Sequence, residues 1–231
     1  MYSPTYAELK LYLQKELDLE GETFITAQEF LGYFQEAIDM TESTIHSIYE
    51  DYFLTSSTLS LVSGIQTVSP PSDIYAQKIR SILYNDGGST KYEIRRIKQF
   101  KETNYFDVND AYKYLVTNDG TNGLKLKFFP VPQETSSNIT IWYIRNAKRP
   151  TADTDIIDIP EFTSVIVQYV RVKCLSKEGH PDAGTEISNL DRMRQEMVET
   201  LTARIPDEDN SLLIDFSFYQ EFDDWRWGGY Y

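Results

Sequence analysis

The stretch FFPVPQETSSNITIWYIRN, residues 128–146, joins two aromatic-rich runs through a loop that contains two prolines. Apolar side chains occupy every second position of both runs: Leu124, Leu126 and Phe128 in the first, and Ile139, Ile141 and Tyr143 in the second. Period-two patterning with β-branched and aromatic residues is typical of strands, and Pro130 and Pro132 would end the first strand. The stretch therefore predicts a β-hairpin with a long loop. Because it contains no histidine or cysteine, it favours a scaffold over an active site.

Strand patterns continue on the N-terminal side of this stretch. Leu59 and Leu61 alternate with polar residues, and Gly64 allows a turn. Further strand-like runs are separated by glycine-containing turns at 85–88 and 118–123. These runs are residues 65–68, 78–84, 92–97 and 112–116. We expect a mainly antiparallel sheet with hairpins, of about five to seven strands, in a β region at residues 55–150.

Helical patterns precede the β region. Ser3 before Pro4 predicts a helix start, and apolar residues then recur at spacings of three and four until Gly21. Thr26 with Glu29 has the sequence of a capping box, which opens a second helix. The apolar stripe of that helix is Phe30, Phe34, Ile38, Ile45, Ile48 and Tyr52. Residues 4–53 therefore predict an N-terminal helical hairpin.

A second helix pair follows the β region. Pro160 opens its first helix, Gly179 ends it, Thr185 caps the next helix, and Pro206 lies beyond the end of the pair. The sequence thus predicts an α+β fold. Residues 1–205 would form a single domain in which helices at 4–53 and 160–205 flank the β region.

The last residues, 206–231, form neither a helical pattern nor a plainly disordered one. Apolar residues again occupy alternate positions, namely Leu212, Ile214, Phe216 and Phe218. This predicts an extended C-terminal arm with no pairing partner left in the chain. Because exposed apolar segments mark interaction sites, we expect an interface there, with Trp225 and Trp227 as further contact residues.

The composition restricts the class of protein. The chain has 231 residues, and 17 Tyr, 12 Phe and 3 Trp give an aromatic share of 14%, which suits either an aromatic β-core or protein interfaces. A net charge of −14 argues against wrapping around duplex DNA, because phosphate binding needs clustered cations. An acidic wall could instead let DNA slide past without sticking. The single cysteine, Cys174, excludes an intramolecular disulfide and lies in an apolar helical run typical of a core position.

No catalytic arrangement emerges. His46 lies among polar helix positions with no neighbouring nucleophile, so we expect a solvated or hydrogen-bonded histidine. His180, Asp182 and Glu186 gather at a turn without the spacing of a metal site. Asp153, Asp155 and Asp158 lack the glycine and the terminal glutamate of a calcium loop, and are better read as a polar linker. The glycine turns do not match a phosphate loop. We expect no enzyme activity, cofactor or metal.

One basic stretch stands out in this acidic chain. It consists of Lys91, Arg95, Arg96, Lys98 and Lys101. It could face an acidic neighbouring subunit or a phosphate backbone, and an ordinary solvated strand face is an equally good interpretation. The N-terminus has neither a basic region nor an apolar region of a signal peptide, and no apolar run is long enough to cross a bilayer. We expect a protein that matures in a reducing cytoplasm, with no membrane partner.

The order of these pieces resembles a known family. A helix pair leads to a turn at Ser63–Gln66 and to Pro-Ser-Asp at 71–73. The strand Leu-Lys-Leu-Lys-Phe-Phe-Pro-Val-Pro at 124–132 and Trp-Tyr-Ile-Arg at 142–145 follow, before a final helix pair after Pro160. Over residues 4–205 this pattern is similar to the head-to-tail connector, or adaptor, proteins of tailed bacteriophages, particularly those with short tails. The aromatic arm is not a shared landmark.

The resemblance implies a structural virion protein of the neck, with no catalytic residues. Related proteins form rings, commonly of twelve copies, between the portal protein and the tail nozzle or tube, and DNA passes through the centre without sequence-specific binding. Two alternatives belong to other classes. Exposed Trp142, Trp225 and Trp227 could be stacking platforms of a carbohydrate- or receptor-binding β module, which would be a β-sandwich with few helices. The acidic composition could also suit a metal-dependent hydrolase.

Overall fold

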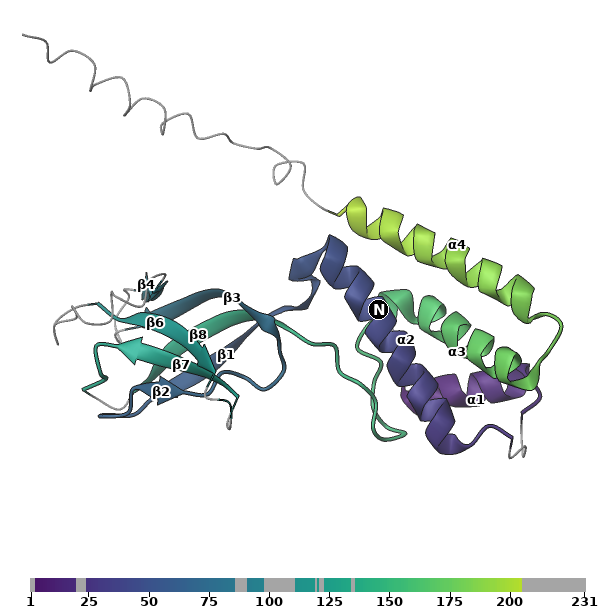
Figure 1. The fold of residues 1–231 in the computed structure, drawn as a ribbon, viewed down its shortest axis with the longest axis horizontal. Coiled ribbons are helices and arrows are strands. Elements are labelled where there is room, and N and C mark those ends of the chain that lie inside the picture. The colour runs from purple at the N-terminus through teal and green to yellow at the C-terminus, as the bar shows by residue number, and fades with distance from the viewer. Residues whose placement is uncertain are drawn as a thin grey trace, which may run out of the picture.

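Two lobes, one of strands and one of helices, lie side by side in a computed structural model of the protein (Figure 1). The structure describes residues 3–19, 24–85, 91–97, 111–118, 120, 123–133 and 136–204. The arm from residue 206, together with Lys98 and Lys101 of the basic stretch, lies outside these ranges. The fold is α+β as expected, with helices before the strands and two further helices after them.

The helical lobe contains α1 (Tyr6–Glu16), α2 (Ala27–Ile48), α3 (Thr163–Glu178) and α4 (Ala183–Thr202). Short 3-10 turns, η1 (Glu50–Phe53) and η3 (Pro160–Phe162), stand where the chain leaves α2 and enters α3. Helix α2 packs against α3 and α4, and α1 meets α2 through the rings of Tyr6 and Phe34, whose centroids are 5.2 Å apart. No helix in the described part of the chain is long and apolar enough to cross a bilayer.

The helix starts test the capping predictions directly. Thr26 and Glu29 form the predicted capping box of α2, and Gly179 ends α3 with a left-handed φ of 68°. Two predicted caps are wrong. Thr5 with Glu8, rather than Ser3, caps α1, because this pair also satisfies the capping-box spacing. Helix α4 begins at Ala183, two residues before Thr185, after a turn at His180–Asp182.

The strands of the described residues form two four-stranded sheets. The first has the order β1 (Leu54–Leu61), β8 (Ser136–Arg145), β3 (Ile74–Asn85) and β4 (Lys91–Glu93), and all of its pairings are antiparallel. The second has the order β2 (Thr67–Val68), β7 (Leu124–Phe129), β6 (Lys113–Asn118) and β5 (Arg95–Arg96). Its β5–β6 pair is parallel, whereas β6–β7 is the expected hairpin around the turn at 118–123.

The hairpin predicted across residues 128–146 is wrong. Both runs are strands, but β7 pairs with β6 and β2 in the second sheet, while β8 lies between β1 and β3 in the first. The proline loop therefore carries the chain from one sheet to the other. The physical reason is burial on opposing faces: Leu126 and Phe128 of β7 pack with Ile139 and Ile141 of β8 in one core between the sheets.

The two lobes have separate apolar cores. The core of the strand lobe lies between the sheets, and the core of the helical lobe lies between α1, α2, α3 and α4. The helical core also takes Ile144 from the end of β8, together with Ala147, Ile157 and Ile159 from the segment that follows. That segment, residues 146–159, therefore joins the lobes and is the natural place to look for residues that fix their arrangement.

Candidate functional site

A polar clamp holds the end of β8 to the start of β3. The hydroxyl of Tyr143 donates a hydrogen bond to Asp73 Oδ1 at 2.9 Å, and Asn146 donates to the Asp73 carbonyl through its backbone N–H at 2.6 Å and through its side chain at 3.1 Å. Burial, together with the bond to Asp73, raises the pKa of Tyr143 to about 12. Asp73 ends the Pro-Ser-Asp motif, so the motif that carries the family resemblance has a structural role here.

Arg145 continues the clamp into the helical lobe. Its guanidinium forms a bidentate ion pair with Asp158, with an Nη2–Oδ1 distance of 3.0 Å, and lies over the ring of Phe53 at 5.3 Å. Asp158 also accepts the backbone N–H of Lys148 at 2.9 Å. Burial alone would lower the pKa of Arg145, but Asp158 raises it overall. The pair ties the last strand to the segment that enters α3.

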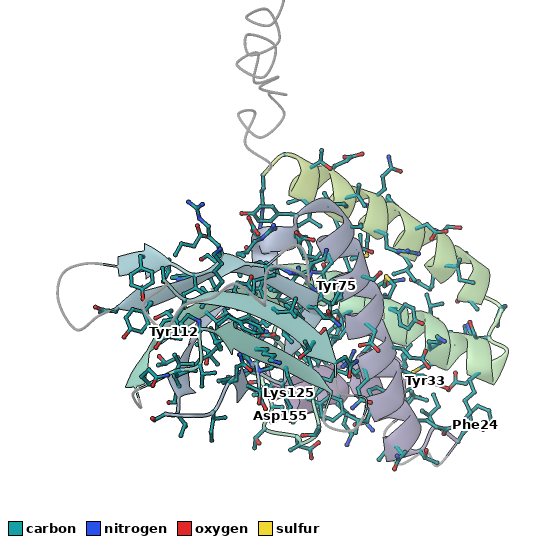
Figure 2. The ribbon with its side chains drawn as sticks, turned by 60° about the vertical axis from the view of Figure 1, so that its left-hand side comes forward. Phe24, Tyr33, Tyr75, Tyr112, Lys125 and Asp155 are labelled. Carbon is teal, nitrogen blue, oxygen red and sulfur yellow. The ribbon has the colours of Figure 1, made fainter. Side chains whose placement is uncertain are left out.

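A third set of contacts comes from α2. Glu42 is 5% exposed and accepts the backbone N–H of Ala147 at 2.7 Å. One turn further, His46 is 7% exposed, and its ring stacks at a centroid distance of 3.7 Å on Tyr75 of β3, a residue that is labelled in Figure 2. Its Nε2 lies 3.4 Å from Glu42 Oε1, yet neither ring nitrogen makes a hydrogen bond within the described residues. Burial lowers the pKa of His46, and Glu42 offsets part of this effect.

His46 is buried and neither ring nitrogen is hydrogen-bonded within the described residues, which corrects the expectation of a solvated or hydrogen-bonded histidine. The histidine is a packing residue between the lobes, because α2 is covered by β3 at this level. Sequence reasoning also missed Glu42, Asp73 and Asn146. The signal for Glu42 was its position four residues before His46 on the same helix face.

None of these groups forms a catalytic unit. His46 has no adjacent nucleophile, and Cys174 is buried, which raises its pKa to about 12 and keeps it a neutral thiol. His180 and Asp182 lie at the predicted turn, 3.6 Å apart, while Glu186 bonds instead to Gln168 and Asn189. Within the described ranges, no three His, Cys, Asp or Glu side chains gather as metal ligands.

The acidic linker residues also have structural partners. Asp155 accepts hydrogen bonds from the backbone of Thr151 and Ala152, which lower its pKa, and Asp158 belongs to the clamp. A hollow of about 830 Å³ lies beside them, lined in part by Lys148, Arg149, Asp155 and Asp158. Asp155 and Asp158 are engaged in the contacts above, and Arg149 forms an ion pair with Asp39.

The second sheet gathers positive charge. Its four strands carry five cations and no carboxylate, although the whole chain has a net charge of −14. The cations are Arg95, Arg96, Lys113, Lys125 and Lys127. Lys125, seen in Figure 2, donates to Ser69, and Lys127 lies over the ring of Phe129. No ion pair of Arg95, Arg96, Lys125 or Lys127 is found with the described residues.

This basic face only partly matches the predicted basic stretch. Arg95 and Arg96 belong to it, and the parallel pairing of β5 with β6 brings them opposite Lys113 and Tyr114. Lys91 lies in β4 of the other sheet, and Lys98 and Lys101 are outside the described ranges. The lysines of β7 were visible in the sequence as alternate positions of one strand, but nothing local indicated that β5 would join their sheet.

Exposed apolar side chains mark one tip of the strand lobe. Val62 and Ile65 stand in the turn after β1, and Val131 stands in the loop after β7; they are 41%, 49% and 37% exposed. Two hydrogen bonds hold these loops together, from Gly64 N to the Pro132 carbonyl at 2.9 Å and from Ser63 Oγ to the Gln133 carbonyl at 2.7 Å. Trp142, 38% exposed, lies on β8 away from this tip.

The structure thus has two lobes held together by polar contacts, a basic face on the second sheet and exposed apolar side chains at one tip of the strand lobe. A search of curated proteins found no match. A comparison with family models found one over residues 4–226, described as SU10 adaptor protein. The match agrees with the resemblance to phage head-to-tail adaptors, and it extends into the C-terminal arm. The chain belongs to the SU10 adaptor protein family.

Proposed function

We propose that this phage structural protein forms a ring of identical copies that joins the portal to the tail and lets DNA pass through its centre. The observation that carries the proposal is the family match over residues 4–226. The resemblance leads us to expect twelve copies, a portal contact on one side and a nozzle or tube contact on the other. The net charge of −14 supports a channel wall that repels DNA.

The clamp between the lobes supports this role. A joint between head and tail must keep its shape, and buried, hydrogen-bonded polar contacts between the lobes oppose their rotation. The helices α1, α2, α3 and α4 also disfavour the alternative of a carbohydrate- or receptor-binding module, which would be a β-sandwich with few helices. In this proposal the molecule acts through its surfaces, and the clamp keeps the two lobes that carry them in a fixed arrangement.

Assembly energy would come from the arm. Burying each of Leu212, Ile214, Phe216 and Phe218 stabilises a complex by about 1.5–3 kcal/mol. Ordering the backbone costs about 1–2 kcal/mol per residue, which is of similar size over the docked segment, so hydrogen bonds of the docked backbone must supply part of the net gain per subunit. Contacts of this size suit a ring, in which every subunit repeats them.

The test compares ring formation and portal binding in two full-length variants. Ile214→Ser with Phe216→Ser removes apolar area from one face of the arm. The matched control, Leu213→Ser with Tyr219→Ser, changes the opposite face. We expect only the first variant to lose co-sedimentation with the portal and ring images in negative stain, with an unchanged circular dichroism spectrum. Equal binding of wild type and both variants would remove the arm from the proposal, and a wild type that forms neither rings nor portal complexes would refute the ring itself.

A further inference from the structure

The first sheet leaves one long strand at its edge. Strand β1 pairs with β8 on one side, and no strand of the described residues pairs with its other side. It is eight residues long, whereas the other edge strands of the two sheets, β2, β4 and β5, have two or three residues each. Proteins usually protect a long edge with charges, a proline or a covering segment, because its free backbone groups recruit other strands. The sequence of β1, LTSSTLSL, has neither a charged residue nor a proline.

We propose that β1 is the acceptor for the C-terminal arm of a neighbouring copy, which adds residues 212–219 as a fifth, antiparallel strand of the first sheet. The proposal deepens the ring proposed above and rests on it. It assigns an interaction surface to β1 and a binding partner to the arm. Such hydrogen bonding of main-chain groups between an added strand and a sheet edge recurs in peptide recognition.

The side-chain pattern of the arm matches that of the edge. Leu59 and Leu61 of β1 face the core between the sheets, and Ser56 and Thr58 are exposed on the other face. In an antiparallel pairing that sets Leu212 opposite Leu61, each even-numbered arm residue stands beside an odd-numbered β1 residue. Ile214, Phe216 and Phe218 would then extend the apolar core, while Asp215 and Ser217 would face solvent with Ser56 and Thr58. A shift of the pairing register by one residue would turn the apolar residues of the arm to solvent and its polar residues to the core.

The reach of the arm favours a neighbouring copy as its source. Arg204, the last described residue, pairs with Glu161 at 2.6 Å, and the ring of the adjacent Phe162 is 6.4 Å from that of Tyr52, just before β1. The arm therefore starts near the Leu54 end. For the arm of the same chain to run antiparallel to β1, Leu212 would have to reach the Leu61 end of the strand. The eight residues after Arg204 span at most about 28 Å, and they would have to cover the strand length of about 23 Å in addition to the distance from Arg204 to Leu54. A neighbour's arm has no such constraint.

An arm added from one copy to the next is a head-to-tail contact. Such heterologous contacts close into rings when the rotation between copies permits. Each copy would offer one edge and one arm, so no edge would remain free in a closed ring. This arrangement uses the two features that the isolated chain leaves unexplained, the long edge and the apolar alternation of the arm.

A disulfide test measures the contact directly. In the proposed register Ser56 and Ser217 lie opposite each other on the exposed face, at a Cα separation of about 4.5–5.5 Å, which a disulfide can bridge. The full-length variant Ser56→Cys with Ser217→Cys should give a ladder of covalent oligomers on a non-reducing denaturing gel after mild oxidation. The native Cys174 is fully buried and should not contribute. The matched control, Ser57→Cys with Ser217→Cys, places the two thiols on opposite faces and should give several-fold less ladder.

Each outcome decides the proposal. A ladder confined to the first variant supports it. A cross-link within one chain, which migrates as a monomer, overturns the neighbour as the source of the arm. Equal ladders from both variants, or none from either, overturn the register and the strand addition. Negative-stain images of the same samples show whether rings are present, so that rings without a ladder reject this contact alone, whereas the lack of both rejects the proposed ring as well.

Discussion

His46 shows how burial sets the chemistry of a single residue. Its ring is enclosed by Glu42, Tyr75 and Phe53, and burial lowers its pKa below the ordinary value. The unfolded chain therefore binds a proton at this position more readily than the native protein does. The contribution of His46 to stability is present above the unfolded pKa of about 6.5 and is lost as the pH falls through the native pKa.

We expect the free energy of unfolding to decrease as the pH is lowered from neutral to mildly acidic values. The decrease should be smaller in His46→Gln, because the substituted side chain does not take up a proton. Urea denaturation at several pH values measures both. The control is His180→Gln at the exposed turn, whose pH profile should follow that of the wild type. A profile of His46→Gln that parallels the wild type would contradict the assignment.

Asp158 is the second residue whose removal has a definite expected cost. Replacing it by Asn weakens the bidentate pair with Arg145 and leaves that partly buried guanidinium without its charged partner. Hydrogen bonds to charged groups contribute about 1.5–3 kcal/mol, so we expect a loss of about 2 kcal/mol in the free energy of unfolding. Asp153→Asn, on the same segment but exposed, should change stability by less than about 0.5 kcal/mol. Equal effects of the two substitutions would argue against a clamp.

At the scale of the element, helix starts depend on a few local contacts. Thr26 accepts the backbone N–H of Glu29 at 3.2 Å, and Glu29 returns the contact by accepting the backbone N–H of Thr26 at 2.9 Å. Glu29 also accepts from Lys177 near the end of α3, which is the main reason its pKa falls to about 2. The capping box therefore also anchors α2 to its neighbour.

Thr26→Ala removes the cap of α2 and should lower the free energy of unfolding by about 1 kcal/mol, since uncapped backbone N–H groups lose their partner. Chemical denaturation monitored by circular dichroism measures the change. Ser43→Ala, exposed in the middle of the same helix, is the control and should be neutral or slightly stabilising, because alanine is the better helix former. A similar loss in both variants would show that the hydroxyl of Thr26 is not acting as a cap.

At the scale of the whole molecule, charge is unevenly distributed. The chain is strongly acidic, yet the second sheet holds five cations without a carboxylate. Five sites are fewer than a duplex-binding protein usually brings to the phosphate backbone, and the rest of the surface repels DNA. We therefore propose an acidic protein neighbour, rather than DNA, as the partner of this face.

We expect the full-length protein not to shift linear duplex DNA in a gel at moderate salt. Lys125→Gln with Lys127→Gln should leave this result unchanged. Tight binding that weakens steeply with salt, and that the double substitution reduces, would make the basic face a DNA-contact surface and would contradict the repulsive channel wall.

The sequence by itself determined the helices and strands, because the information for an element lies within a few residues. The Thr26 capping box, the Gly179 helix end and the alternation in β7 and β8 were all readable from local spacing. The turn at 118–123 likewise marked the hairpin of β6 and β7. The expectation of an adaptor also came from the order of such pieces, and the family match agrees with it.

Only the tertiary structure decided which elements meet. Local patterns are the same whether β7 pairs with β8 or faces it across a core, and burial between two sheets selected the second arrangement. The same reason explains His46. Its neighbours on the helix are polar in the sequence, but β3 packs against it in the folded protein. It also explains the basic face, which needed β5 and β6 to lie side by side. Pairings between distant segments depend on apolar area that the whole chain buries together, and no short stretch of sequence contains that quantity.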